Sequence, residues 1–172
     1  MNDNQSRYST TYDSENMDYL KKELLLSISS ILQEIVEEQH EFKEIRRTVF
    51  YSKTVPGISI ESYLDRMIKY TKMETSTLIL ILIYIDRICE YNSLVISRYN
   101  VHRLLLAAMI VSIKVNEDDF YSNSFYSKVG GVTLEELNSL ENEFLKLIRY
   151  RLWTDFNLYY KYKVNLMKYD KL

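Results

Sequence analysis

Residues 104–113, LLLAAMIVSI, are apolar at nine of ten positions, and Lys114 follows without a turn signal. A helix over this stretch is apolar on nearly every side, so other helices must surround it. Ala107 and Ala108 would let those neighbours approach closely. The sequence therefore predicts a central helix, with Asn100 as its N-cap, in an all-α domain.

The rest of the composition agrees with helices joined by short loops. The 172 residues include only three glycines and one proline, too few for the many turns of a β or doubly wound fold. Two capping boxes mark helix starts, Thr71 with Glu74 and Thr133 with Glu136. The first box indicates that the apolar run 78–85, LILILIYI, is part of a helix rather than a buried strand.

The expected order divides the chain into four parts. The polar residues 1–16 are interpreted as a disordered tail rather than a regulated segment. A helical pattern then predicts an N-terminal helix within 17–47. Residues 50–155 contain five core helices, and the tyrosine-rich residues 156–172 form a C-terminal extension. No internal repeat is evident.

Charge and hydropathy exclude several classes of partner. The net charge is −2 and no long basic run occurs, so nucleic acid is not an expected partner. The apolar runs are too short to cross a bilayer, so no membrane contact is expected. The N-terminus has no apolar signal region, and the single Cys89 excludes an internal disulfide. Both features predict an intracellular protein of the cytoplasm, the nucleus or both.

Candidate catalytic and metal-binding residues lack their necessary companions. Glu37 and His40 have the Glu-x-x-His spacing of di-iron sites in helix bundles, but His102 has no glutamate three residues before it. Gly130–Gly131 lacks the Lys-Ser/Thr of a phosphate-binding loop, and a helix end explains it better. Cys89 has no evident histidine partner. We therefore expect no enzyme activity, no metal and no cofactor.

Two carboxylates lie within apolar stripes and need partners. Glu141 follows Leu137 by four residues in the predicted helix 134–148, and Asp86 lies behind a similar stripe. An unpaired buried charge costs several kcal/mol. Spacing leaves two readings open. Lys114 pairs internally with Glu141 or Asp86 for structure alone, or Lys114 and Glu141 lie at a rim where another protein's backbone completes their hydrogen bonds.

Several stretches resemble the cyclin box, and more specifically the phosphate-pathway, or P/U-type, cyclins. The resemblance covers about residues 50–155. The stretches that carry it are YIDRI, TVPGISIESYLDRMIKY, SRYNVHRLLLAAMIVSIK and FYSNSFYSKVGGVTLEELNSLENEFL.

This resemblance implies a single five-helix cyclin box that binds and activates a cyclin-dependent protein kinase. In cyclins, the lysine that ends the third box helix and a glutamate in the fifth hydrogen-bond the kinase backbone, and these match Lys114 and Glu141. Asp86 and Arg87 match the YIDR element, which we interpret as structural. Where mitotic-type cyclins carry a Met-Arg-x-x-Leu docking patch, this chain reads PGISIESYL.

Two further alternatives concern function. Glu117, Asp118 and Asp119 follow Lys114 by about one turn, and they either attract arginines of the kinase activation segment or form a solvated acidic loop. Cyclin-like helical folds also serve as kinase-independent scaffolds or transcription-factor modules. Purification with or without a co-eluting kinase separates that function from kinase activation.

Overall fold

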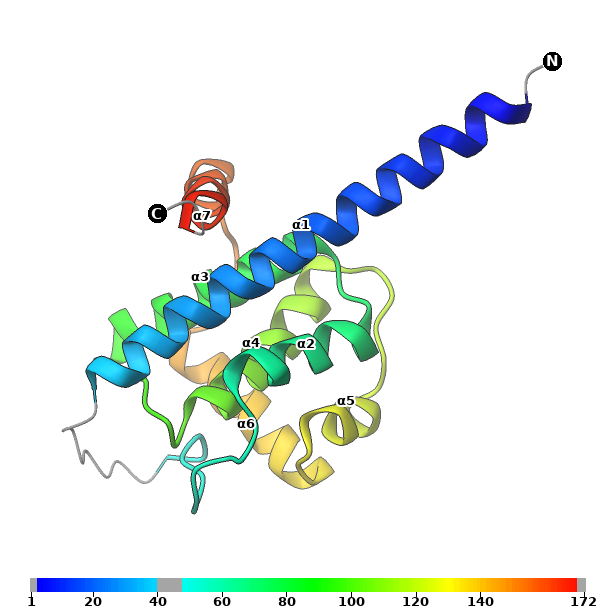
Figure 1. Cartoon of the computed structure of the whole chain (residues 1–172). Helices are drawn as coiled ribbons and strands as arrows, with labels where there is room; N and C mark the ends of the chain where they lie inside the picture. Colours follow the sequence, from blue (N-terminus) through cyan, green and yellow to red (C-terminus); the bar gives the residue numbers. More distant parts are fainter. Residues whose placement is uncertain (1–2, 40–47, 170–172) are drawn as a thin grey trace.

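The computed structural model describes residues 3–39 and 48–169. Its described residues contain helices and loops but no strand, which confirms the all-α class (Figure 1). The helices are α1 (Asp3–Glu38), α2 (Ile60–Thr71), α3 (Thr75–Asn92), α4 (Val101–Asn116), α5 (Asn123–Gly130), α6 (Leu134–Leu147) and α7 (Phe156–Tyr169). They correspond to the expected N-terminal helix, five core helices and C-terminal extension.

Helix α4 is the centre of the domain. Every residue from Leu104 to Ile113 is buried, and the helix packs against α2, α3 and α6. Figure 1 shows α4 in the middle of the fold, with α1 crossing one side of it. Each fully buried leucine, isoleucine or methionine contributes about 1.5–3 kcal/mol, so this helix anchors the core.

Helix α1 differs from the expectation at both ends. It begins at Asp3 rather than near Met17, so residues 3–16, expected as a disordered tail, are helical in the structure. No glycine or proline interrupts that stretch. The helix ends at Glu38, and residues 40–47 lie outside the described part. Its N-terminal part extends beyond the other helices in Figure 1.

The capping box of α6 is confirmed. The hydroxyl of Thr133 accepts from the backbone N–H of Glu136 at 3.1 Å, and the Glu136 carboxylate accepts from the Thr133 N–H at 2.9 Å. Hydrogen bonding to the Thr133 backbone lowers the pKa of Glu136. The two residues are only three positions apart, so the sequence pattern alone was enough to predict this capping box.

The capping box predicted for α3 is wrong, although the helix itself is present. Thr71 is the last residue of α2, and its hydroxyl donates to the Met67 carbonyl at 2.8 Å. The cap comes from α4 instead. The Glu117 carboxylate accepts from the Glu74 N–H at 2.9 Å and from the Thr77 hydroxyl at 2.5 Å. This tie joins the end of α4 to the start of α3.

Asn100 is at the N-cap position of α4, but its side chain makes no capping bond. Its amide donates to the Val95 carbonyl at 2.8 Å, and its oxygen accepts from the Ser97 N–H at 2.8 Å. Asn100 is fully buried, so it orders the preceding loop from within. The predicted position is confirmed, whereas the predicted role is replaced by loop bracing.

Gly130 and Gly131 end α5, as expected. Gly131 has the left-handed φ of 69° that favours glycine at a helix C-cap. Gly130 is required for a different reason. A Cβ at this position would lie 2.4 Å from one methyl of Leu106, a fully buried residue of α4. Close packing of α5 on the central helix therefore depends on the missing side chain.

Replacing Gly130 by alanine should destabilise the fold by about 1–3 kcal/mol, because the new methyl overpacks the Leu106 contact. Urea denaturation measures the change. Gly57→Ala is the matched control, since a Cβ at Gly57 meets nothing within 4 Å and should leave stability nearly unchanged. A Gly130→Ala variant as stable as the native chain would contradict the packing argument.

Candidate partner-binding site

Lys114 and Glu141 form a salt bridge near the surface. Lys114 is in the last turn of α4 and Glu141 is on α6, and their Nζ and Oε1 atoms are 2.6 Å apart. The side chains are 29% and 16% exposed, so the pair is neither sealed nor fully solvated. Of the two internal pairings left open by the sequence, the one between Lys114 and Glu141 is formed.

Asn123 fixes the orientation of Glu141. Its amide nitrogen donates to Glu141 Oε2 at 2.7 Å and to Asn138 Oδ1 at 2.8 Å. The Asn123 oxygen is buried without a hydrogen-bond partner in the described residues. Sequence reasoning missed Asn123, because no local pattern connects the first residue of α5 with the middle of α6.

The pair retains capacity for further hydrogen bonds. An ammonium group has three donors, and the Lys114 ammonium makes its described bond to Glu141 alone. A second protein can therefore approach the exposed side of Lys114 with a backbone carbonyl, and that of Glu141 with an N–H group. The two helices hold both charges in place before any partner arrives.

Apolar side chains are exposed in the chain that follows Lys114. Val115 is 48% exposed, Phe120 54% and Tyr121 46%. The Tyr121 ring is 4.3 Å from the Phe125 ring, and its N–H donates to the Tyr126 hydroxyl at 3.0 Å. Exposed aromatic residues of this kind are enriched at protein interfaces.

The acidic loop divides into two kinds of carboxylate. Glu117 is occupied by the α3 cap, whereas Asp118 and Asp119 are exposed. They line a surface hollow of about 490 Å³ together with Phe120 and Tyr121. The role predicted for Glu117, Asp118 and Asp119 toward a kinase stays a prediction, and Glu117 also binds the start of α3.

Asp86 and Arg87 connect α3 to the C-terminal segment. Asp86 Oδ2 accepts from the Tyr162 hydroxyl of α7 at 2.8 Å, and burial raises the pKa of the Asp86 carboxyl. The Arg87 guanidinium donates to the carbonyls of Arg151 and Trp153. Asp86 thus contacts α7 rather than Lys114, and the contacts agree with a structural role for both residues.

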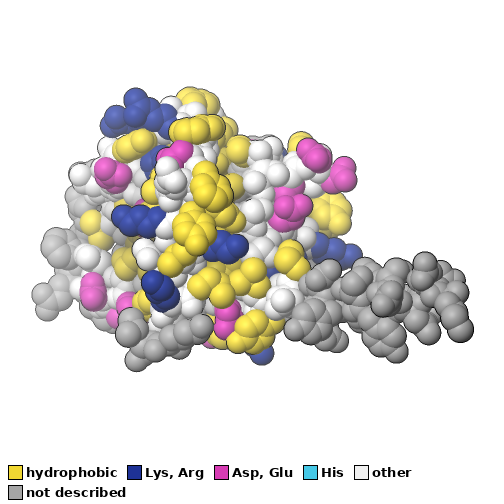
Figure 2. Space-filling view, turned by 90° about the horizontal axis from the view of Figure 1, so that it is seen from above, with side chains coloured by type: hydrophobic (Ala, Val, Ile, Leu, Met, Phe, Trp, Pro, Cys, Tyr) yellow, Lys and Arg dark blue, Asp and Glu magenta, His cyan; other side chains and the backbone are white. Residues whose placement is uncertain are grey.

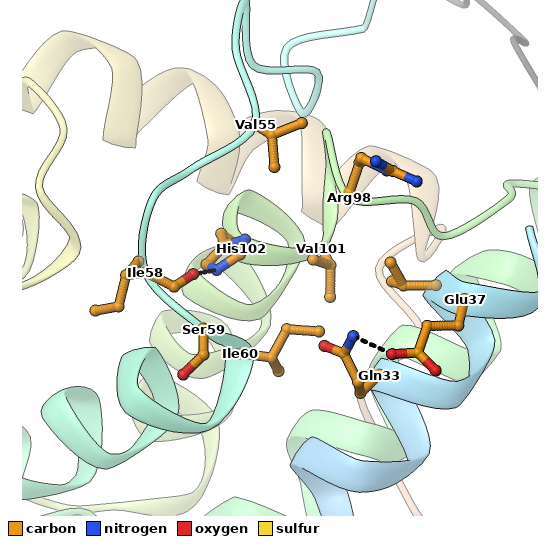
Figure 3. A pocket seen from close by; sticks show the side chains of 10 residues that line it. Gln33, Glu37, Val55, Ile58, Ser59, Ile60, Arg98, Val101 and His102 are labelled. Atoms are coloured by element: carbon orange, nitrogen blue, oxygen red, sulfur yellow. Dashed lines mark hydrogen bonds between the residues drawn. The ribbon is translucent and has the colours of Figure 1, made fainter. Parts of the chain in front are cut away.

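A cavity of about 260 Å³ lies between α1 and the starts of α2 and α4 (Figure 3). His102 Nε2 is 2.9 Å from the Ile58 carbonyl oxygen, and burial lowers the His102 pKa. Gln33 donates to Glu37 at 2.7 Å on the opposite wall. The His102 contact joins the start of α4 to the chain before α2, whereas His102 Nδ1 is buried without a hydrogen-bond partner among the described residues.

Three smaller points concern metal binding, the Cys89 thiol and membrane crossing. His40 lies outside the described residues, and in the described part no group of three or more His, Cys, Asp or Glu is arranged to hold a metal ion. Burial raises the pKa of the Cys89 thiol to about 12, so its reactive thiolate is scarce at neutral pH. Within the described ranges, no helix combines the length and apolarity that crossing a bilayer requires.

Comparison with known proteins covers almost the whole chain. A family model of cyclins matches residues 3–152, which include α1. Cyclin-U4-2 of Arabidopsis thaliana is 37% identical over 163 residues, covering 91% of this chain and 76% of that protein. Cyclin-U2-1 of the same plant is 40% identical over 119 residues, covering 69% of this chain and 54% of that protein.

A fungal relative extends the comparison. PHO85 cyclin-7 of Saccharomyces cerevisiae is 33% identical over 178 residues, covering 88% of this chain and 62% of that protein. The chain thus spans between about half and three quarters of the length of these relatives. Their names confirm the resemblance to P/U-type cyclins that the sequence motifs indicated.

Replacing Tyr162 by phenylalanine should lower the free energy of unfolding by about 1 kcal/mol at neutral pH, because charged Asp86 loses its hydrogen bond. Burial makes the folded protein bind the Asp86 proton more tightly than the unfolded chain does. The loss should therefore shrink as pH falls through the raised folded-state pKa toward the ordinary value of 3.8.

Urea denaturation at neutral and mildly acidic pH measures this difference. Tyr160→Phe, on the same helix but 55% exposed, is the matched control and should show no change at either pH. An equal loss at both pH values would mean that Asp86 is not the acceptor that matters.

Proposed function

The chain belongs to the cyclin family, and from this premise we propose that it binds a cyclin-dependent protein kinase and holds that kinase in its active conformation. The observation that carries the proposal is the Lys114–Glu141 salt bridge, which is preformed yet partly exposed. It lies at the positions that the resemblance assigns to kinase contact, and exposed apolar residues follow Lys114 along the chain.

The proposed mechanism is a population shift. A free kinase of this class rests mostly with its regulatory helix displaced, which separates the Lys–Glu ion pair required for phosphoryl transfer. A protein that binds only the active form moves the equilibrium toward it. A shift from 1:99 to 99:1 needs about 5.5 kcal/mol of differential affinity. A standard interface of about 1,600 Å² is large enough to supply it.

Within this interface the two charges have separate tasks. Lys114 donates to carbonyls of the kinase backbone, and Glu141 accepts from its N–H groups. Because α4, α6 and Asn123 already hold the pair, little side-chain freedom is lost on binding. Apolar residues such as Phe120 supply most of the affinity, and the charges set the register.

The same proposal defines the wider setting. The chain acts as a regulatory subunit of the kinase, in the cytoplasm, the nucleus or both, where such kinases phosphorylate proteins. Purification of the tagged chain from its own cells identifies the kinase by mass spectrometry. If no kinase co-elutes, the scaffold or transcription-factor function replaces this proposal.

Lys114→Glu should raise the Kd for the kinase about 30-fold or more and abolish activation, because it places like charges together at the contact. Glu141→Lys should act similarly. Kinase activity at increasing cyclin concentrations measures the loss. Lys146→Glu, which reverses a more exposed charge on the same helix as Glu141, is the matched control.

The double exchange Lys114→Glu with Glu141→Lys distinguishes an internal role from an interface role. If the pair acts only within the chain, the exchange restores both stability and activation. If each group contacts the kinase backbone, the exchange restores stability alone, since donor and acceptor are now reversed. Circular dichroism and thermal unfolding report stability in the same samples.

Asn123→Ala should raise the Kd for the kinase about tenfold, because Glu141 loses the bond that orients it. Isothermal titration with the purified kinase measures the change. Asn138→Ala is the control, since that residue contacts Asn123 but not Glu141 in the described bonds. Equal effects of the two variants would assign Asn123 a purely structural role.

A further inference from the structure

The segment between α6 and α7 exposes aromatic side chains to an unusual extent. Trp153 is 80% exposed, Phe156 74% and Tyr150 64%, the three highest values for large hydrophobic residues in the described part. Tyr160 continues the surface along α7, with its ring stacked against that of Phe156 at 5.9 Å. Isolated exposed hydrophobic residues are common, but several exposed aromatic residues close together in the chain, two of them stacked, are typical of an interaction site.

The backbone behind these side chains is held rigidly. The carbonyls of Arg151 and Trp153 accept from Arg87, and the Leu152 carbonyl accepts from the Tyr84 hydroxyl at 2.6 Å. Three consecutive carbonyls are thus bonded to side chains of α3. A surface fixed in this way loses little conformational freedom when a partner binds.

The same segment contains backbone strain. Arg149 and Tyr150 have φ values of 57° and 54°, a left-handed conformation that is unfavourable for residues other than glycine. Such strain persists where the surrounding structure imposes it, and it gathers at functional positions. Here the left-handed conformation occurs at Tyr150, whose side chain is exposed to solvent.

Positive charge accompanies the aromatic residues. Residues 86–91 and 149–161 contain four cationic and three acidic side chains. Two of the carboxylates are already bonded within the chain, Asp86 by Tyr162 and Asp155 by the Leu158 N–H at 3.0 Å. The guanidinium groups of Arg149 and Arg151 both lie over the Tyr91 ring, at 4.9 and 5.9 Å. The bonds to the two carboxylates come from neutral donors and leave the charges in place, so the two stretches carry a net charge of +1, with Arg149, Arg151 and Lys161 all exposed.

Figure 2 looks down on the side of the molecule where α7 lies. It shows hydrophobic side chains gathered in a band, with Lys and Arg side chains beside it. We infer that the exposed aromatic residues Tyr150, Trp153, Phe156 and Tyr160, with Arg149 and Arg151, bind an acidic segment of another protein that carries apolar side chains between its carboxylates. We call these six residues the Trp153 surface.

Tryptophan, tyrosine and arginine are the residues that dominate binding energy at interfaces, which agrees with this composition. Acidic side chains of the ligand pair with the guanidinium groups, and its apolar side chains cover the aromatic rings. The Trp153 surface is separate from the proposed kinase contact. Glu141 of the kinase contact precedes Arg149 of the Trp153 surface by eight residues along α6 and its end, or about 12 Å of helix.

The experiment selects peptides from a displayed random library on the full chain and then measures their binding by fluorescence. Trp153 is the only tryptophan, so a blue shift of its emission on peptide binding reports contact at this residue. We expect the selected peptides to be acidic with interspersed apolar residues, and their affinity to fall as salt rises. Replacing their acidic residues with glutamine should abolish binding.

Variants of the chain locate the site. Trp153→Ala and Arg149→Glu should each raise the Kd of the selected peptides about 30-fold, measured by anisotropy of labelled peptide. Tyr19→Ala removes another exposed aromatic residue, 62% exposed on α1, and should change nothing. Trp153→Ala should still activate the kinase, which separates this surface from the proposed function.

Three outcomes would overturn the inference. The library yields no peptide that shifts Trp153 emission, the selected peptides are neutral or basic, or Trp153→Ala binds them as well as the native chain does. Sedimentation of the chain alone provides a further test. A dimer that Trp153→Ala dissociates would assign the surface to a second copy of this chain instead.

Discussion

The burial of α4 on all sides is the constraint on which the rest of the structure depends. A helix without a polar face cannot lie at a surface, so α2, α3 and α6 must enclose it. The neighbouring helices must approach α4 closely. The missing side chain of Gly130 allows this where α5 meets Leu106. Because the helix leaves the core at Lys114, the first charge after its apolar run must emerge beside whichever helix covers that end.

The end of α4 satisfies two needs with neighbouring residues. Lys114 pairs with Glu141 on α6, and Glu117 supplies the cap that α3 lacks. Glu117 Oε1 accepts from a backbone N–H and a hydroxyl of α3, whereas the Lys114 ammonium keeps donors toward the surface. Residues three positions apart on one turn thus have different tasks, one within the fold and one available to a partner.

Sequence reasoning succeeded where the interactions were local. The Thr133 box and the left-handed Gly131 depend on neighbours within a few residues, and both were predicted. The cap of α3 could not be predicted, because Glu117 lies 43 positions from Glu74 and no spacing rule connects them. The same limit hid Asn123, whose bond to Glu141 joins two helices.

The apolar periodicity of the sequence could not identify the partners of the buried carboxylates. It showed that Asp86 and Glu141 both needed partners, yet the choice between them depends on which helices meet in space. In the structure Asp86 accepts from Tyr162 on α7, and Glu141 pairs with Lys114. The end of α4 is bound to the start of α3, nine residues or about 14 Å of helix before Asp86, so Lys114 lies beside Glu141 rather than Asp86.

Helix α3 contacts the segments that form both surfaces, one near each of its ends. Its start is bound by Glu117, and its second half holds the carbonyls beneath Trp153. A buried helix fixed at both ends does not change length, so it transmits a signal only if a second arrangement exists. The two surfaces lie farther apart than the 7–10 Å over which neighbouring sites usually couple. Binding energies at the Lys114 and Trp153 surfaces should accordingly add, which lets a kinase and an acidic segment occupy the chain together.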